Sequence, residues 1–230
     1  MFRFGSPLVI AVAVLFCLHV RPMEARAEAM TLSGFSLVQR VTVGGTNLLN
    51  EHGTVWAGEL RWQWAGVPPQ QFAQVFFAYC VDLAKDVKSP QKVSIQTSDG
   101  FTNGVTLGGA KAAWLFNEYA AGIHDARDTV GAAALQVAIW EAMYDTAPDL
   151  TTGGFDAVGT NSSITNRANQ YLSSLYSSTW NAVAIILNAD TKTGGGQDQI
   201  TQVSEPSTLL FLGLAFFGIA TLTGRFRRTA

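Results

Sequence analysis

The sequence is poor in the residues on which most catalytic and metal sites depend. Its 230 residues include two cysteines and three histidines, and charged side chains make up 14%. His52 and His124 show no ligand spacing relative to Cys80, which argues against a zinc site. No cysteine-hydrolase signature surrounds Cys80, and no P-loop or dinucleotide fingerprint occurs. We therefore expect a protein that is not an enzyme and has neither metal nor cofactor.

Positive charge is scarce in the central part of the chain. Six of the 15 basic residues lie in segments 1–27 and 204–230, together with only two of the 17 acidic residues. Segment 28–203 therefore has nine basic and fifteen acidic side chains, a net charge of −6. Because no basic stripe is present to neutralise phosphates, the sequence argues against nucleic-acid binding.

The N-terminus has the order of a secretory signal. Arg3 precedes an apolar run at 8–20, and the small-x-small sequences ARA (25–27) and AEA (27–29) follow. This pattern predicts a signal peptide over 1–27 and export by the Sec route, with cleavage after residue 27 or residue 29.

The C-terminus contains the one long apolar run outside the signal. Residues 208–224 carry no charge, and Arg225, Arg227 and Arg228 follow directly. Seventeen residues are at the low end of what spans a bilayer as a helix. The arginines predict a stop-transfer signal with a cytoplasmic end, by the positive-inside rule.

The residues before this run complete a three-part signal. Ser204, Glu205 and Pro206 lead into the apolar segment, so 204–230 resembles the PEP-CTERM sorting signal of Gram-negative bacteria. Ser204 stands where that motif has its first proline. The resemblance implies processing by an exosortase, insertion into the inner membrane, and then display at the cell surface or in the extracellular matrix.

Segment 28–203 has the length of one domain with its own core. Hydrophobic patterns predict strands, then helices, then strands, which is an α+β organisation. The expected strands are 35–43, 54–64, 74–83, 91–97, 182–188 and 198–203, the last two forming a hairpin. The expected helices are 110–122, ending at Gly122, a second capped by Asp128 or Thr129 and running to about Asp145, and a third at about 165–176.

Cys80 is the one cysteine left after removal of Cys17 with the signal peptide. In the oxidising compartment that the signal predicts, cysteines normally pair, and here an internal disulfide is impossible. One interpretation is a buried thiol that acts as a small hydrophobe. Another is an intermolecular disulfide, which predicts a dimer.

A third interpretation links Cys80 to Gln136, a polar residue on an otherwise apolar helix. A thiol that attacks a buried carboxamide releases ammonia and leaves a thioester. The reaction requires near-attack geometry, donors for the tetrahedral oxyanion and exclusion of water. We assign supporting or shielding roles to Tyr79, Asp82 and Trp140.

Two sequence motifs resemble a known family. Tyr79-Cys80-Val81 and the segment 136–140 (QVAIW) are similar to the motifs of bacterial thioester domains, also called Cys-Gln or TQXA domains, across about 35–190. The resemblance implies a β-sandwich or barrel with a helical insertion. It also implies that Cys80 is the thiol partner and Gln136 the acyl partner of a thioester that amines attack. Leu135 replaces the threonine of the family motif.

We therefore expect a surface protein that attaches covalently to an amine-bearing protein or polysaccharide, in adhesion or in a biofilm matrix. The Gram-positive adhesins of the family carry sortase-type anchors, so a host-cell ligand does not follow. The alternative is a non-covalent structural or glycan-binding matrix protein with a buried free cysteine. In that case Trp56, Trp62 or Trp64 would stack on sugars.

Overall fold

The computed structural model describes residues 28–46, 53–69, 71–102, 105–180, 182–189 and 195–202. The predicted signal peptide (1–27) and sorting signal (204–230) lie outside these residues. The predicted sorting and stop-transfer residues also lie outside them, namely Glu205, Pro206, Arg225, Arg227 and Arg228. Within the described ranges, no helix is both long enough and apolar enough to cross a membrane.

Six antiparallel strands form a closed barrel in the order β1-β2-β3-β6-β5-β4. Pairing of β1 with β4 closes it, and β5 pairs with β6 as the predicted hairpin requires. The strands are β1 (Glu28–Val43), β2 (Gly53–Trp64), β3 (Val75–Cys80), β4 (Gln91–Thr97), β5 (Ile185–Ala189) and β6 (Gln199–Thr201).

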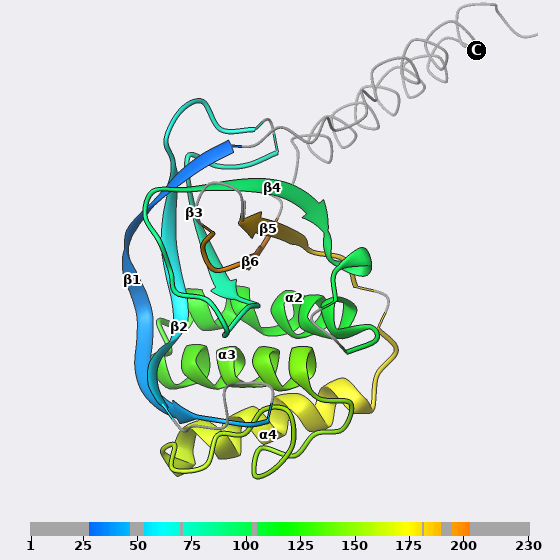
Figure 1. Ribbon diagram of the computed structural model, residues 1–230. Helices are drawn as coiled ribbons and strands as arrows, with labels where there is room; N and C mark the ends of the chain where they lie inside the picture. The colour runs from blue at the N-terminus through cyan, green and yellow to red at the C-terminus, as the bar shows by residue number, and fades with distance from the viewer. Residues whose placement is uncertain are drawn as a thin grey trace, which may run out of the picture.

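The helices lie between β4 and β5 in the chain. They are the short 3₁₀ helix η1 (Ser98–Gly100) and the α-helices α2 (Gly108–Ala126), α3 (Thr129–Tyr144) and α4 (Ser162–Tyr176). Figure 1 shows the three α-helices stacked against one end of the barrel. The predicted α+β class, with a helical insertion between strands, is confirmed.

Several predicted boundaries were wrong, among them the end of α2, the start of β1 and the end of β3. Helix α2 continues through Gly122 to Ala126, because an exposed glycine inside a helix costs only about 1 kcal/mol and does not end it. Its end is set by Arg127, which adopts a left-handed conformation with φ of 52°. Strand β1 begins at Glu28, before the predicted 35, and β3 ends at Cys80, before the predicted 83.

Aromatic side chains fill the barrel. The Trp64 ring stacks on Phe76 at 5.0 Å and meets Phe72 edge-on at 5.2 Å, and Trp62 is fully buried beside them. Trp62 and Trp64 therefore cannot be the sugar-stacking surface that the glycan-binding alternative required. Trp56 is 58% exposed, because the β1–β2 ribbon extends past the strands that close the barrel.

Helix α3 is the centre of the second core. It lies between α2 and α4 and packs against β1 and β2 (Figure 1). As predicted, Asp128 caps its start, with the carboxylate accepting from Gly131 N at 2.8 Å. Every residue from Gly131 to Tyr144 is buried, so any polar side chain on this helix must find its partners inside the protein.

Candidate functional site

The structure brings Cys80 and Gln136 together. The Gln136 side-chain oxygen Oε1 accepts from the Cys80 backbone N–H at 2.9 Å, and Nε2 donates to the Cys80 carbonyl at 2.7 Å. Both residues are buried, with 1% of Gln136 and 3% of Cys80 exposed. Strand β3 and helix α3 thus meet at this pair, although 56 residues separate the two in sequence.

The barrel itself explains why a glutamine fits here. Val81 N donates to the Asp198 carbonyl at 2.9 Å, so its backbone groups face β6. Backbone groups of successive strand residues face alternate edges, and those of Cys80 therefore face the β2 side. The pairing of β2 with β3 stops at Leu60 and Ala78. The Gln136 carboxamide occupies the position that the next β2 residue would have taken.

The Cys80 thiol is held by the residue that follows the strand. Sγ donates to the Asp82 carbonyl at 3.1 Å and accepts from Asp82 N at 3.3 Å. Burial raises the pKa of the thiol well above its usual value, while the Trp140 indole N–H and the Asp82 backbone oppose that rise. Cys80 is the one cysteine in the described part of the chain and forms no disulfide there, and its raised pKa favours the protonated thiol.

Tyr79 and Trp140 lie on different sides of the strand end. Trp140 is 1% exposed, and its N–H has no acceptor at ordinary hydrogen-bond geometry within the described residues, although it lies near the thiol. Tyr79 points to the opposite face of β3, and lines a cavity of about 310 Å³ with Phe77 and His124. Of the two predicted shielding aromatics, Trp140 is the one next to sulfur.

Gln199 is the cross-strand neighbour of Cys80. The two Cα atoms are paired in the β3–β6 ladder, and Cys80 makes its backbone hydrogen bonds elsewhere, so their side chains lie side by side on one face. Gln199 is fully buried, and its Nε2 donates to the Gln197 carbonyl at 3.3 Å. Its Oε1 has no hydrogen-bond partner among the described residues.

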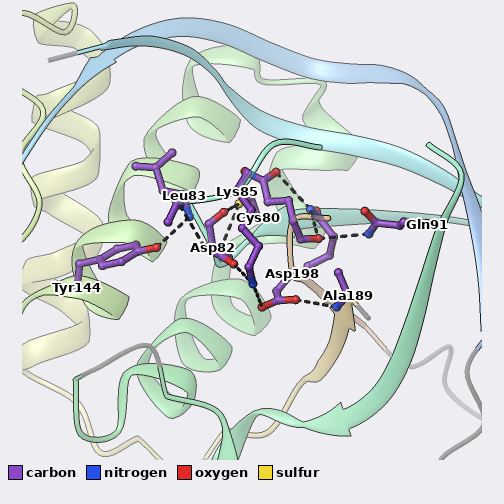
Figure 2. A network of polar contacts seen from close by, with 11 residues as sticks. Cys80, Asp82, Leu83, Lys85, Gln91, Tyr144, Ala189 and Asp198 are labelled. Atoms are coloured by element: carbon purple, nitrogen blue, oxygen red, sulfur yellow. Dashed lines mark hydrogen bonds and ion pairs between the residues drawn. The ribbon is translucent and has the colours of Figure 1, made fainter. Parts of the chain in front are cut away.

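A lysine bridges two carboxylates beside the thiol (Figure 2). Lys85 Nζ lies 2.5 Å from Asp82 Oδ2 and 3.6 Å from Asp198 Oδ2. Burial alone would lower the pKa of Lys85, but its bond with Asp82 brings that pKa above the usual value. Burial raises the pKa of Asp198, although the hydrogen bond from the Ala189 backbone N–H and the charge of Lys85 each lower it in part.

Backbone contacts fix both carboxylates in place. Asp82 Oδ1 accepts from Ala84 N at 3.1 Å, and Asp198 Oδ1 accepts from Ala189 N at 2.7 Å. The loop that carries Asp82 is also anchored at Leu83 N, which donates to the Tyr144 hydroxyl on α3 at 3.0 Å. The acidic pair is therefore preorganised, whereas the lysine is attached by a flexible side chain.

Sequence reasoning found Cys80, Gln136, Asp82 and Trp140 but missed the residues around them. The spacing of Asp82 and Lys85 is an ordinary one for surface residues, and it carried no signal without Asp198. Gln199 sits in a short polar stretch that reads as a solvent-exposed strand end. Only the closed barrel brings these residues to Cys80.

No group of histidine, cysteine, aspartate or glutamate side chains in the described ranges could hold a metal ion. Comparisons with protein-family models, with curated proteins and with solved structures give no match.

Proposed function

We propose that the protein is an exported surface protein whose domain 28–203 forms a thioester between Cys80 and Gln136. The thioester serves covalent attachment to an amine-bearing surface or matrix target. The observation that carries this proposal is the pair of hydrogen bonds, 2.9 and 2.7 Å long, between the Gln136 carboxamide and the Cys80 backbone.

These hydrogen bonds suit the bond-forming step. Sulfur attacks the Gln136 side-chain carbonyl carbon, and the resulting oxyanion forms on Oε1, which already accepts the Cys80 N–H. The C–N bond then breaks, Nε2 takes up the thiol proton and leaves as ammonia. Two hydrogen bonds fix the carboxamide beside the Cys80 backbone, and a reaction between neutral groups requires the acyl carbon to be positioned near sulfur in this way.

Burial serves the product as well as the reaction. The thiol and the carboxamide are almost completely removed from solvent, so water that would hydrolyse a thioester is excluded. Burial raises the pKa of the thiol and so disfavours the thiolate. The Trp140 N–H has the opposite effect on this pKa, and it favours negative charge on sulfur. Attack by an amine then forms an amide at Gln136 and releases the Cys80 thiol.

The surface location rests on the sequence signals at the two ends. Export through the Sec route, membrane insertion by 208–224 and processing by an exosortase-type enzyme would deliver the domain to the cell surface or the matrix. Attachment there would serve adhesion or the biofilm matrix. The resemblance of the 79–81 and 136–140 motifs to bacterial thioester domains supports the same function.

Intact mass of the full chain tests the thioester directly. We expect the wild type to lack the mass of one ammonia, and Cys80→Ala and Gln136→Ala to have their full calculated masses. Gln170→Ala, which alters an exposed glutamine on α4, is the matched control and should retain the deficit. A wild type of full mass with a thiol that alkylates after unfolding would contradict the proposal.

A second candidate function is non-covalent glycan binding, which an exposed aromatic surface favours. Phe35 and Trp56 are 53% and 58% exposed, with ring centroids 6.4 Å apart, and the Arg40 guanidinium lies 6.0 Å from the Trp56 ring. Such a surface suits stacking on a sugar ring. If this function is the relevant one, Trp56→Ala abolishes retention on a glycan array and Cys80→Ala does not.

A further inference from the structure

The cavity of about 310 Å³ that Tyr79 lines lies between α2 and the strands β2 and β3, on the face of β3 opposite Cys80. Its lining residues differ in exposure. Those at the inner end are buried and include Glu59, Tyr79, Phe116 and Ala120, whereas Ala73, Ala121, Asp125 and Gln202 are exposed. The cavity therefore has a mouth to solvent and a closed inner end.

A glutamate and a histidine meet at the inner end. Glu59 is 1% exposed, and its two carboxylate oxygens lie 3.1 and 3.0 Å from Nδ1 of His124, which donates to them. His124 is the one hydrogen-bond partner of Glu59 in the described part of the chain. A carboxylate has about four lone-pair sites, and here a single N–H donor serves both oxygens. Glu59 can therefore accept a further hydrogen bond, and each donor that a buried carboxylate gains stabilises it.

Aromatic rings line the same inner end of the cavity. The ring centroids of Phe77 and His124 are 4.2 Å apart, and Tyr79 meets Phe116 edge-on at 6.0 Å. The Tyr79 hydroxyl is buried and has no hydrogen-bond partner among the described residues. Burial, and then the charge of Glu59, raise the pKa of this hydroxyl, so it lies within electrostatic reach of the carboxylate. The inner end thus combines apolar ring surface with an acceptor that has room for a donor.

We propose that this cavity binds the ring of a neutral phenol, with the ring hydroxyl donating to Glu59. The volume suits one substituted ring, because an apolar cavity of about 150 Å³ already accepts benzene. A phenol O–H is a stronger donor than an aliphatic O–H, since its pKa is about 10, and hydrogen bonds to a carboxylate are stronger than those between neutral groups.

The charges at the cavity favour a neutral ligand over an ion. Glu59 and Asp125 both line the cavity and repel anions. An ammonium group loses far more hydration than a hydroxyl group when it enters apolar surroundings, and His124 already presents its Nδ1–H to the carboxylate. A free phenol and the tyrosine side chain of a partner protein share the ring and hydroxyl that the cavity requires. The site does not depend on the proposed thioester, because it lies on the opposite face of β3.

The test compares the binding of p-cresol and 4-methylanisole to the full chain. The two compounds have the same ring, but 4-methylanisole has no O–H donor. Ligand-observed saturation-transfer NMR measures both dissociation constants. We expect p-cresol to bind at least about tenfold more tightly, the factor for one hydrogen bond to a charged group. Equal affinity of the two compounds, or binding of neither, would overturn the proposal.

Two variants locate the bound ring. Glu59→Gln keeps the size of the side chain and removes its charge, so it should reduce the preference for p-cresol at least about threefold, whereas Glu118→Gln, an exposed position on α2 outside the cavity, should not. Ala121→Trp fills the mouth and should weaken binding of both compounds, while Glu118→Trp should have no effect.

Wild-type binding in Ala121→Trp would place the ring elsewhere and overturn the site, and this result can be read even if Glu59→Gln does not fold. An unchanged preference for p-cresol in a folded Glu59→Gln protein would overturn the role of the carboxylate. N-acetyltyrosinamide identifies the source of the ring. Binding tighter than that of p-cresol supports the tyrosine side chain of a partner protein as the ligand, and weaker binding supports a free phenol.

Discussion

Gln136 and Glu141 lie five residues apart on α3 and are equally buried, yet the protein satisfies them differently. Both hydrogen-bonding ends of the Gln136 carboxamide meet the Cys80 backbone. Glu141 accepts only from Asp149 N, at 2.7 Å, and its Oε2 has no partner among the described residues. Burial consequently raises the pKa of Glu141 to about 8.

The difference shows which buried polar groups a core can hold at low cost. A neutral carboxamide that completes the edge of a strand replaces the hydrogen bonds that a neighbouring strand would supply. A carboxylate with one free oxygen must instead take up a proton, because an unpaired buried charge is far more costly. Gln136 is therefore buried at low cost, because the Cys80 backbone satisfies both ends of its carboxamide.

The largest expected effect follows from removing the Gln136 carboxamide. In a Cys80→Ala background, which excludes any contribution from a thioester, Gln136→Leu leaves a buried N–H and a buried C=O without partners. We expect it to lower the free energy of unfolding by about 1–3 kcal/mol for each group. Denaturant titration of the full chain measures this loss.

The exposed residue Gln170 on α4 offers the matched control in the same background. Gln170→Leu should change stability by less than about 0.5 kcal/mol. An equally small effect of Gln136→Leu would mean that the Cys80 backbone finds other hydrogen-bond partners. The Gln136 carboxamide would then not stabilise the fold.

Glu141 predicts a pH dependence of stability. The unfolded chain loses this proton near pH 4.5 and the folded chain near pH 8. Between these values the folded state binds more protons, so stability falls as pH rises, by up to about 1.4 kcal/mol per pH unit. Glu141→Gln should remove most of this slope in denaturant titrations run from pH 5 to 8.

The exposed Glu118 on α2 provides the comparison for that measurement. Glu118→Gln should keep the wild-type slope. If Glu141→Gln also keeps it, Glu141 is ionised in the folded state at neutral pH and has a partner that neutralises it.

A smaller effect is expected at the start of α3, outside the buried pair. Asp128 caps the helix through Gly131 N and contacts Arg167 at 3.2 Å. Asp128→Ala should cost about 1 kcal/mol, the usual contribution of an N-cap, in the same denaturation assay. Asp125→Ala, an exposed position near the end of α2, should have almost no effect. If the two substitutions change stability equally, Asp128 does not stabilise α3 as an N-cap.

The order of the elements could be predicted from the sequence because periodicity depends only on which residues face the core. The Asp128 cap and the helical position of Gln136 followed from local patterns in the same way. The hydrogen bonds between Gln136 and the Cys80 backbone could not be predicted, because they depend on where the β2–β3 pairing stops, at Leu60 and Ala78. No local pattern encodes that position.

Glu141 and Gln199 were missed for a related reason. A glutamate on a helix and a glutamine near a chain turn are normally solvated, and here the burial of α3 on all sides and the closure of the barrel remove the solvent. Asp198 likewise joins Asp82 and Lys85 only through the β3–β6 pairing. Tertiary closure, and not residue type, creates the acidic pair beside the thiol.

The Cys80–Gln136 thioester is tested most sharply by the intact mass of the full chain, measured beside that of Cys80→Ala. We expect the wild type to lack the mass of one ammonia, the variant to have its full calculated mass, and methylamine to add its own mass to the wild type alone. If both proteins have their full calculated masses and neither gains methylamine, the protein does not form a Cys80–Gln136 thioester.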